Sequence, residues 1–154
     1  TYVLESEVKH MKWVYDDGGR SEYFKGTTDD CVVRAIAIAT GKDYKEVYDL
    51  INKYSKEELA TLDEVYKSNT RTGVSKELSY KILQDLGYKW IAKMKFGQGC
   101  KTHLKAGELP SKGTFIVSLS KHLTVIKDGV IHDIYDPSRN GTRCVYGYFE
   151  KIND

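Results

Sequence analysis

The chain has 154 residues, of which 40% are hydrophobic and 30% are charged, and this size and composition fit one globular domain over residues 1–154. Only two prolines are present and no low-complexity run occurs, which excludes intrinsic disorder and collagen-like structure. The net charge of +2 does not by itself indicate a nucleic-acid or membrane surface. The longest apolar stretch, around Ala35–Ala39, is far shorter than the roughly 20 residues that span a bilayer, so no membrane partner is expected.

The cysteines are odd in number and lie far apart in the sequence, at Cys31, Cys100 and Cys144. This distribution argues against a framework of disulfides and for a reducing compartment, with at least one free thiol. The N-terminal residues also lack the basic and then apolar pattern of a secretory signal. We therefore expect a cytoplasmic protein.

The first 26 residues predict a short hairpin. Apolar and polar residues alternate over Tyr2–Leu4 and Met11–Tyr15, and the pattern breaks at Asp16–Gly19.

The next segment predicts a central helix over Asp30–Thr40. Residues that cap helix N-termini gather at Thr27–Asp30, and Gly41 is a typical residue for the end of a helix. Apolar residues lie on nearly every side of this helix, and Arg34 is its only charge after Asp30. Such a helix has to be covered by protein all round.

Two further helical regions follow. Asp43–Glu46 reads as a capping box before an amphipathic helix, and a second capping signal at Ser55–Glu58 predicts two helices joined near Tyr54. Ser75 is expected to cap one more helix, which ends at Gly87.

After Gly87 the hydrophobic period changes from 3.6 to 2, which predicts strands. The clearest signal is Asp128-Gly129 between two apolar runs, which is typical of a β-hairpin. The expected strands cover Tyr88–Phe96, Thr114–Leu119, His122–Lys127, Val130–Tyr135 and Arg143–Ile152, and Gly97–Gly113 is expected to be a loop. Helices first and strands later predict an α+β domain in which the N-terminal central helix packs on an antiparallel sheet.

Three of these elements place side chains that suit thiol chemistry. Cys31 lies at a helix N-terminus, where the helix dipole favours a thiolate and unsatisfied N–H groups can hold an oxyanion. His122 opens a strand and can act as a general base. With a two-residue turn, His122 lies opposite Tyr135, so Asp136 is next to it along the strand, while Asp133 shares its face diagonally. Either carboxylate could orient the imidazole.

The segments Asp-Asp-Cys-Val-Val-Arg-Ala-Ile (29–36) and Lys-His-Leu-Thr-Val-Ile-Lys-Asp-Gly-Val-Ile-His-Asp-Ile-Tyr-Asp-Pro (121–137) resemble the papain-like cysteine peptidase superfamily. Within it, the chain is most similar to C39-like peptidases and phage-encoded papain-like proteins, which would place it in a host cytoplasm. The resemblance implies a papain-like fold, with Cys31 as nucleophile, His122 as general base and Asp136 as orienting residue. The sequence lacks the Cys-Gly-Ser/Ala-Cys-Trp/Tyr signature of papain proper.

One position departs from the family pattern. The family usually has a Gln six residues before the nucleophile to complete the oxyanion hole, and this chain has Lys25. Lys25 could donate a hydrogen bond and a charge in place of the amide, or the chain is an altered relative. The expected function is therefore a cysteine hydrolase that cleaves an amide, peptide or isopeptide bond in a peptide or protein substrate, without a cofactor. The alternative is a papain-like protein that binds a protein or nucleic acid.

Two competing interpretations have weaker signals. Cys100-Lys-Thr-His103 offers one pair of zinc ligands, with His132 and Cys144 as possible completions, but a structural zinc site usually brings two tight pairs. No metal is therefore expected.

A nucleic-acid surface would rest on a basic bias between Gly87 and Gly113, chiefly Lys89, Lys93 and Lys95. Alternating lysines also protect an edge strand from aggregation, which is the simpler interpretation.

Overall fold

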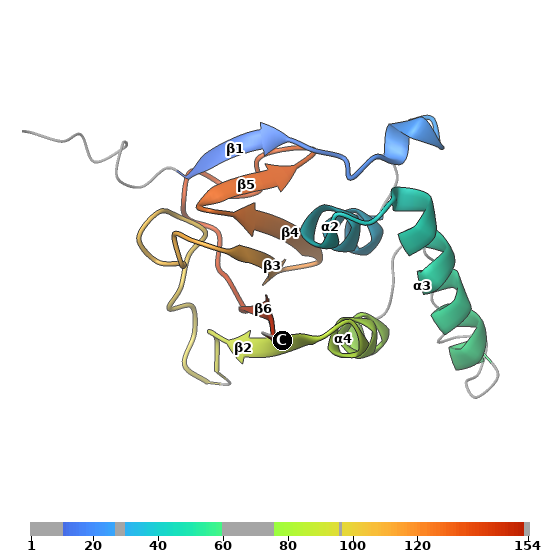
Figure 1. Cartoon of the computed structure of the whole chain (residues 1–154). Coiled ribbons are helices and arrows are strands. Elements are labelled where there is room, and N and C mark those ends of the chain that lie inside the picture. Colours follow the sequence, from blue (N-terminus) through green and yellow to red (C-terminus); the bar gives the residue numbers. More distant parts are fainter. Residues whose placement is uncertain (1–10, 27–29, 60–75, 96, 153–154) are drawn as a thin grey trace, which may run out of the picture.

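The computed structural model describes residues 11–26, 30–59, 76–95 and 97–152. Helices come mainly before strands, and the fold is α+β as expected (Figure 1). In chain order the elements are β1 (Lys12–Tyr15), the short 3-10 helix η1 (Arg20–Glu22), α2 (Cys31–Thr40), α3 (Tyr44–Leu59), α4 (Lys76–Asp85), β2 (Tyr88–Ala92), β3 (Thr114–Leu119), β4 (His122–Lys127), β5 (Val130–Asp133) and β6 (Gly147–Lys151).

The strands form one six-stranded sheet in the order β1-β5-β4-β3-β6-β2. The pairs β4·β5, β3·β4, β3·β6 and β2·β6 are antiparallel, as predicted, but β1 pairs with β5 in parallel. The expectation of a fully antiparallel sheet is therefore wrong at the β1 edge. The first arm of the predicted N-terminal hairpin, Tyr2–Leu4, lies outside the described residues, while the second arm joins the C-terminal half of the chain.

The two faces of the sheet are covered differently (Figure 1). Helices α2 and α4 pack on one face, and α3 packs against these two helices; Ile116, Val125 and Phe149 of the sheet belong to the core that they share. The other face carries Phe115 and Val117 and is covered by loop residues such as Leu104 and Val145. Neighbouring residues of β3 thus enter opposite cores, which explains why its sequence is continuously apolar.

Helix α2 is the central helix, as its all-round apolar sequence predicts. Seven of its residues are buried, and it packs against β3, β4 and α3. It ends at Gly41, whose φ of 74° is the left-handed conformation that glycine adopts without strain.

The expected junction near Tyr54 is wrong, because α3 is one continuous helix of 16 residues. Ser55, which had suggested a second N-cap, is buried inside the helix, and the Tyr54 hydroxyl donates to Asp85 Oδ2 at 2.6 Å. Contacts with α4 therefore favour a continuous α3 across residues whose local sequence signals a new helix start. Ser75, the predicted cap of α4, lies outside the described residues.

Candidate active site

A buried charge cluster fixes the start of α2, where Cys31 is the first residue. Asp30 precedes it and is 1% exposed, yet its carboxylate does not cap the helix. It forms an ion pair with Arg34 one turn later, accepts a hydrogen bond from the Tyr44 hydroxyl, and lies 3.5 Å from Arg20 Nη1. Burial and the hydrogen bond to Asp30 raise the pKa of Tyr44, so the phenol stays protonated and donates. The other expected cap formers, at 27–29, lie outside the described residues.

His122 occupies the first position of β4, directly after a tight turn. Leu119 pairs with His122 in the β3·β4 ladder, so Ser120 and Lys121 alone make the turn, and Lys121 adopts a φ of 55°. The imidazole Nε2 lies 2.7 Å from Asp133 Oδ2. Both side chains are almost inaccessible to solvent, with 8% and 3% of their surfaces exposed. The pair therefore joins the start of β4 to the end of β5 where little solvent reaches either side chain.

Asp133 is itself held from two sides. Its second carboxylate oxygen, Oδ1, accepts a hydrogen bond from the amide of Ile134 at 2.7 Å. Its carbonyl oxygen accepts from the Trp13 indole at 3.0 Å and from the amide of Asp16 at 2.9 Å. The parallel strand β1 thus supports the carboxylate that contacts His122.

The position of Asp136 differs from the sequence-based preference. The predicted register is confirmed, since Val125 pairs with His132 and the rings of His122 and Tyr135 lie 5.2 Å apart. However, β5 ends at Asp133, and Asp136 is exposed in the following turn, where its Oδ1 accepts from the amide of Ser138 at 3.0 Å. Side chains alternate between faces, so Asp133 lies on the face of His122 and Asp136 does not. Asp133 is the carboxylate that this geometry brings to the imidazole.

The environment of His122 favours its protonated form. Burial alone lowers the pKa of this imidazole, but hydrogen bonding and charge interactions with Asp133 and Cys31 outweigh burial and raise the pKa to about 9. His122 is therefore an imidazolium at neutral pH, between a carboxylate on one side and the Cys31 sulfur on the other. A protonated imidazole beside a cysteine sulfur is an arrangement that can activate a thiol as a nucleophile.

Cys31 and His122 both line a cavity of about 370 Å³. Its wall is apolar at Val32 and Leu123 and carries two lysines, Lys76 and Lys121. The remaining lining residues are Ser79, Tyr80, Ser118, Leu119 and Tyr146.

Lys25 is not among the described residues that line this cavity. It is exposed, and its carbonyl oxygen accepts a long hydrogen bond of 3.4 Å from Arg20 Nη2. The structure therefore does not bring the predicted oxyanion donor to the sulfur. The donors that remain close to Cys31 are backbone N–H groups in the first turn of α2, which have no partner within the helix.

The basic residues of the proposed nucleic-acid surface lie along the sheet edge. β2 is the last strand of the sheet, and it contains Lys89 and is followed by Lys93 and Lys95. Lys89 Nζ lies 3.9 Å from Glu150 Oε2, and Lys93 Nζ lies over the ring of Tyr148. This is the place where lysines protect an edge strand, and nucleic-acid binding stays a prediction.

The expectation of no disulfide is wrong, because Cys100 and Cys144 are joined across 44 residues. Cys31 is free, as a nucleophile must be. Two loops that are distant in the sequence meet at this bond, and nothing in the spacing of the cysteines indicates it. The inference of a reducing compartment loses its basis, since it rested on unpaired cysteines.

None of the helices in the described part of the chain has the length and apolar character that crossing a membrane requires. Comparison of the chain with protein-family models, with curated proteins and with solved structures finds no match.

Proposed function

We propose that the chain is a cysteine hydrolase with a papain-like fold, which cleaves an amide, peptide or isopeptide bond through Cys31, His122 and Asp133. The observation that carries this proposal is the 2.7 Å contact of His122 Nε2 with Asp133 Oδ2, at the edge of a cavity that Cys31 and His122 both line. The raised pKa of His122, to which both Asp133 and Cys31 contribute, agrees with this geometry. A papain-like fold is supported by a cysteine at the start of the central helix and a histidine at the start of the strand against which it packs.

The first half of the reaction follows from the protonation of His122. In this mechanism the proton resides on His122 and Cys31 reacts as a thiolate. Its sulfur attacks the carbonyl carbon of a substrate in the cavity. The negative charge that develops on the carbonyl oxygen is stabilised by backbone N–H groups at the start of α2 and by the positive end of the helix dipole. His122 then gives its proton to the leaving nitrogen, the carbon–nitrogen bond breaks, and a thioester to Cys31 remains.

The second half returns the protein to its starting state. Neutral His122 takes a proton from water, and the resulting hydroxide attacks the thioester carbonyl. The carbon–sulfur bond breaks, the carboxylic acid product leaves, and the proton on His122 again pairs with the Cys31 thiolate. Through both halves, Asp133 holds the imidazole in one orientation and balances its charge.

The cavity also suggests which substrates to try. Val32 and Leu123 offer an apolar wall, and Lys76 and Lys121 place positive charge beside it. We propose that an acyl group with an apolar side chain and a nearby carboxylate fits this lining.

The proposal is tested with a panel of fluorogenic peptidyl amides and isopeptides, half of them acidic. A hydrolysed substrate is then converted into an electrophilic analogue, and the protein is analysed by intact and peptide mass spectrometry. We expect one adduct per chain, on Cys31, and no adduct in Cys31→Ala. Asp136→Asn is the matched control for Asp133→Asn, because it removes a nearby exposed carboxylate that does not contact His122.

Binding without catalysis is the second candidate, and the exposed position of Lys25 favours it, because the family's side-chain oxyanion donor has no counterpart in the described cavity lining. Under this alternative the folded protein hydrolyses none of the substrates and Cys31 reacts no faster than an ordinary thiol. If a nucleic acid is the partner, binding weakens steeply with salt, since lysine contacts release counterions from phosphates.

A further inference from the structure

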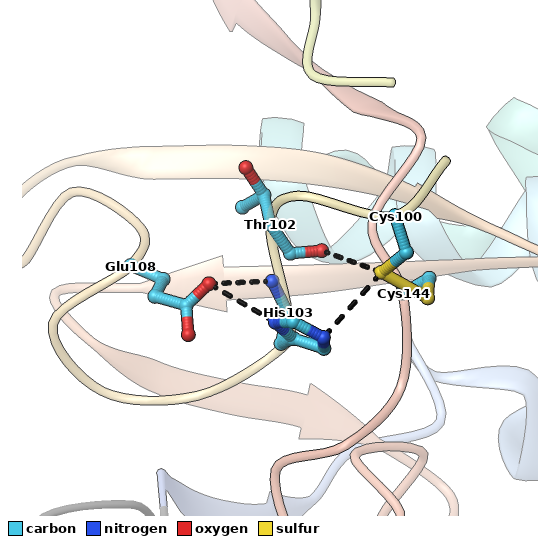
Figure 2. Close-up of a disulfide and its surroundings, with 5 residues drawn as sticks. All are labelled: Cys100, Thr102, His103, Glu108 and Cys144. Carbon is cyan, nitrogen blue, oxygen red and sulfur yellow. Dashed lines mark hydrogen bonds and ion pairs between the residues drawn. A yellow bond between two sulfur atoms is a disulfide. The ribbon is translucent and has the colours of Figure 1, made fainter. Parts of the chain in front are cut away.

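A second cluster of reactive side chains surrounds the disulfide (Figure 2). Its neighbours Leu104 and Val145 belong to the core on one face of the sheet, whereas Cys31 packs against the core on the other. The Cys100–Cys144 disulfide is the centre of the cluster, and His103 Nε2 lies 3.5 Å from Cys100 Sγ. The two sulfurs and an imidazole nitrogen all lie within 4.8 Å of one another. Solvent reaches Cys100, while His103 and Cys144 are half-buried.

The backbone holds this cluster together independently of the disulfide. His103 and Cys144 face each other in an isolated antiparallel bridge. Leu104 N donates to Arg143 O, and Val145 N donates to Thr102 O, both at 2.8 Å. The side chains of Leu104 and Val145 are fully buried in the core beneath. Breaking the sulfur–sulfur bond therefore leaves His103 and Cys144 anchored side by side.

Glu108 sets the orientation of the His103 ring. Its Oε1 lies 3.2 Å from His103 Nδ1 and accepts the backbone N–H of His103 at 2.9 Å, as Figure 2 shows. Lys105 Nζ contacts the other carboxylate oxygen at 3.0 Å. A carboxylate at Nδ1 places the ring proton there and leaves the lone pair of Nε2 directed at the sulfurs. Histidines that bind metals usually have this carboxylate partner on the other nitrogen.

We propose that, once the disulfide is reduced, Cys100, Cys144 and His103 bind one zinc-class divalent ion. Two thiolates and one imidazole are the donors that Zn²⁺ prefers, and three protein ligands leave a fourth position for water. His132, which the sequence offered as a completion, is not part of the site, because its Nδ1 lies 3.1 Å from Asp16 Oδ2.

The disulfide and the metal exclude each other. A dithiol reductant supplies two electrons, becomes a cyclic disulfide itself, and leaves both cysteines as thiols. The metal then replaces the two thiol protons, which pass to solvent, and takes a lone pair from each sulfur and from Nε2. In the oxidised protein the sulfurs of Cys100 and Cys144 are bonded to each other, so neither can bind a metal as a thiolate. The loops that carry Cys100 and Cys144 are thus joined by a covalent bond in the oxidised protein and by a metal ion in the reduced protein.

The test uses full-length Cys31→Ala protein, so that Cys31 cannot contribute a ligand. The protein is reduced with a dithiol, which is removed without oxygen, and Zn²⁺ is titrated against a chromophoric chelator, with Co²⁺ as a spectroscopic probe. We expect one metal per chain and a sulfur-to-cobalt charge-transfer band. Glu108→Gln is expected to weaken binding about 10–100-fold, as loss of an outer carboxylate does in other sites. His103→Gln and Cys144→Ser are expected to weaken it at least as much.

Two controls complete the test. The same protein without reduction should bind no zinc, and His132→Ala in the reduced protein should bind as tightly as its parent. The proposal is overturned if the reduced protein takes up no metal, if the cobalt complex has no thiolate band, or if His103→Gln and Cys144→Ser both bind as the parent does. Should Cys144→Ser fail to fold by circular dichroism, His103→Gln decides alone, because it keeps both cysteines.

Discussion

The molecule has two cysteine sites, and they are built in different ways. Cys31 lies at a helix start and shares a cavity with His122 at the start of β4, which in turn contacts Asp133 at the end of β5. Cys100 and Cys144 belong to loops that meet at an isolated bridge and at the disulfide. The first site is positioned by the ends of regular elements, and the second by the path of irregular chain. The comparison suggests a division between a reactive thiol and a pair that stabilises the loops.

The largest expected effect is on hydrolysis, which should depend on Cys31 and not on the disulfide. We expect Cys31→Ala to abolish hydrolysis of any substrate that the wild-type protein cleaves, because no other described thiol lines the cavity. Cys144→Ser should keep activity within a few-fold of wild type. Initial rates with purified, folded proteins measure both. Comparable losses in the two variants would contradict the division.

The second-largest expected effect on activity concerns His122, the proposed general base. His122→Ala should lower kcat/KM by about 10²–10⁴-fold, the usual contribution of a positioned acid–base group. His132→Ala is the matched control, because this histidine pairs with Asp16 outside the cavity. A similar loss in both histidine variants would indicate a general effect on folding, and circular dichroism would show it.

Loss of the disulfide should act on stability. Removing a crosslink over 44 residues is expected to lower the free energy of unfolding by about 2–4 kcal/mol, since the unfolded chain regains conformational freedom. Urea unfolding of Cys144→Ser and of wild type, without metal, measures this difference. An unchanged unfolding midpoint would mean that the disulfide does not restrict the unfolded chain enough to stabilise the folded state.

The His122–Asp133 pair should make stability depend on pH. The pKa of His122 is raised from 6.5 to about 9, so its contribution is fully present below pH 6.5 and is lost as pH rises through about 9. The full difference is about 3 kcal/mol, at about 1.4 kcal/mol per pKa unit. We expect Asp133→Asn to remove most of this pH dependence in urea unfolding.

Asp136→Asn provides the comparison for this measurement, because it removes the same group from an exposed turn. Its stability should follow the wild-type profile between pH 6.5 and pH 9. If Asp136→Asn flattens the profile and Asp133→Asn does not, the assignment of the orienting carboxylate has to be reversed.

The smallest expected effect lies at the cavity. Lys121→Asn removes a charge beside His122, and Asn tolerates the positive φ of this position. We expect KM for acidic substrates to rise a few-fold while kcat changes little, because the charge acts on binding and not on the reacting atoms. Neutral substrates of the same panel serve as the control, and an equal change for both would exclude a role in charge selection.

Much of the first site could be predicted from sequence, because its signals are local. The stop at Gly41 and the Asp128-Gly129 turn define the end of α2 and the register of the β4–β5 hairpin without any distant contact. The choice between Asp133 and Asp136 could also have been made. The alternation of faces along the strand favours Asp133, and the resemblance to a family favoured the other position.

The rest depends on contacts between distant parts of the chain. β1 pairs with β5 in parallel, and no turn joins them to set the register. Asp30 reads as a capping residue, but two buried arginines, Arg20 and Arg34, take its carboxylate. The disulfide requires two loops to meet over the core that contains Leu104 and Val145. Local propensity contains no information on such pairings.

The most direct test of the central claim is the rate at which each cysteine reacts with iodoacetamide at neutral pH, followed by peptide mass spectrometry in wild type and in His122→Ala. If Cys31 and His122 form a reactive pair, Cys31 labels faster than a simple free thiol in wild type and slows markedly in the variant, while Cys100 and Cys144 stay unlabelled. Equal Cys31 rates in the two proteins, or faster labelling of Cys100 than of Cys31, would contradict the account.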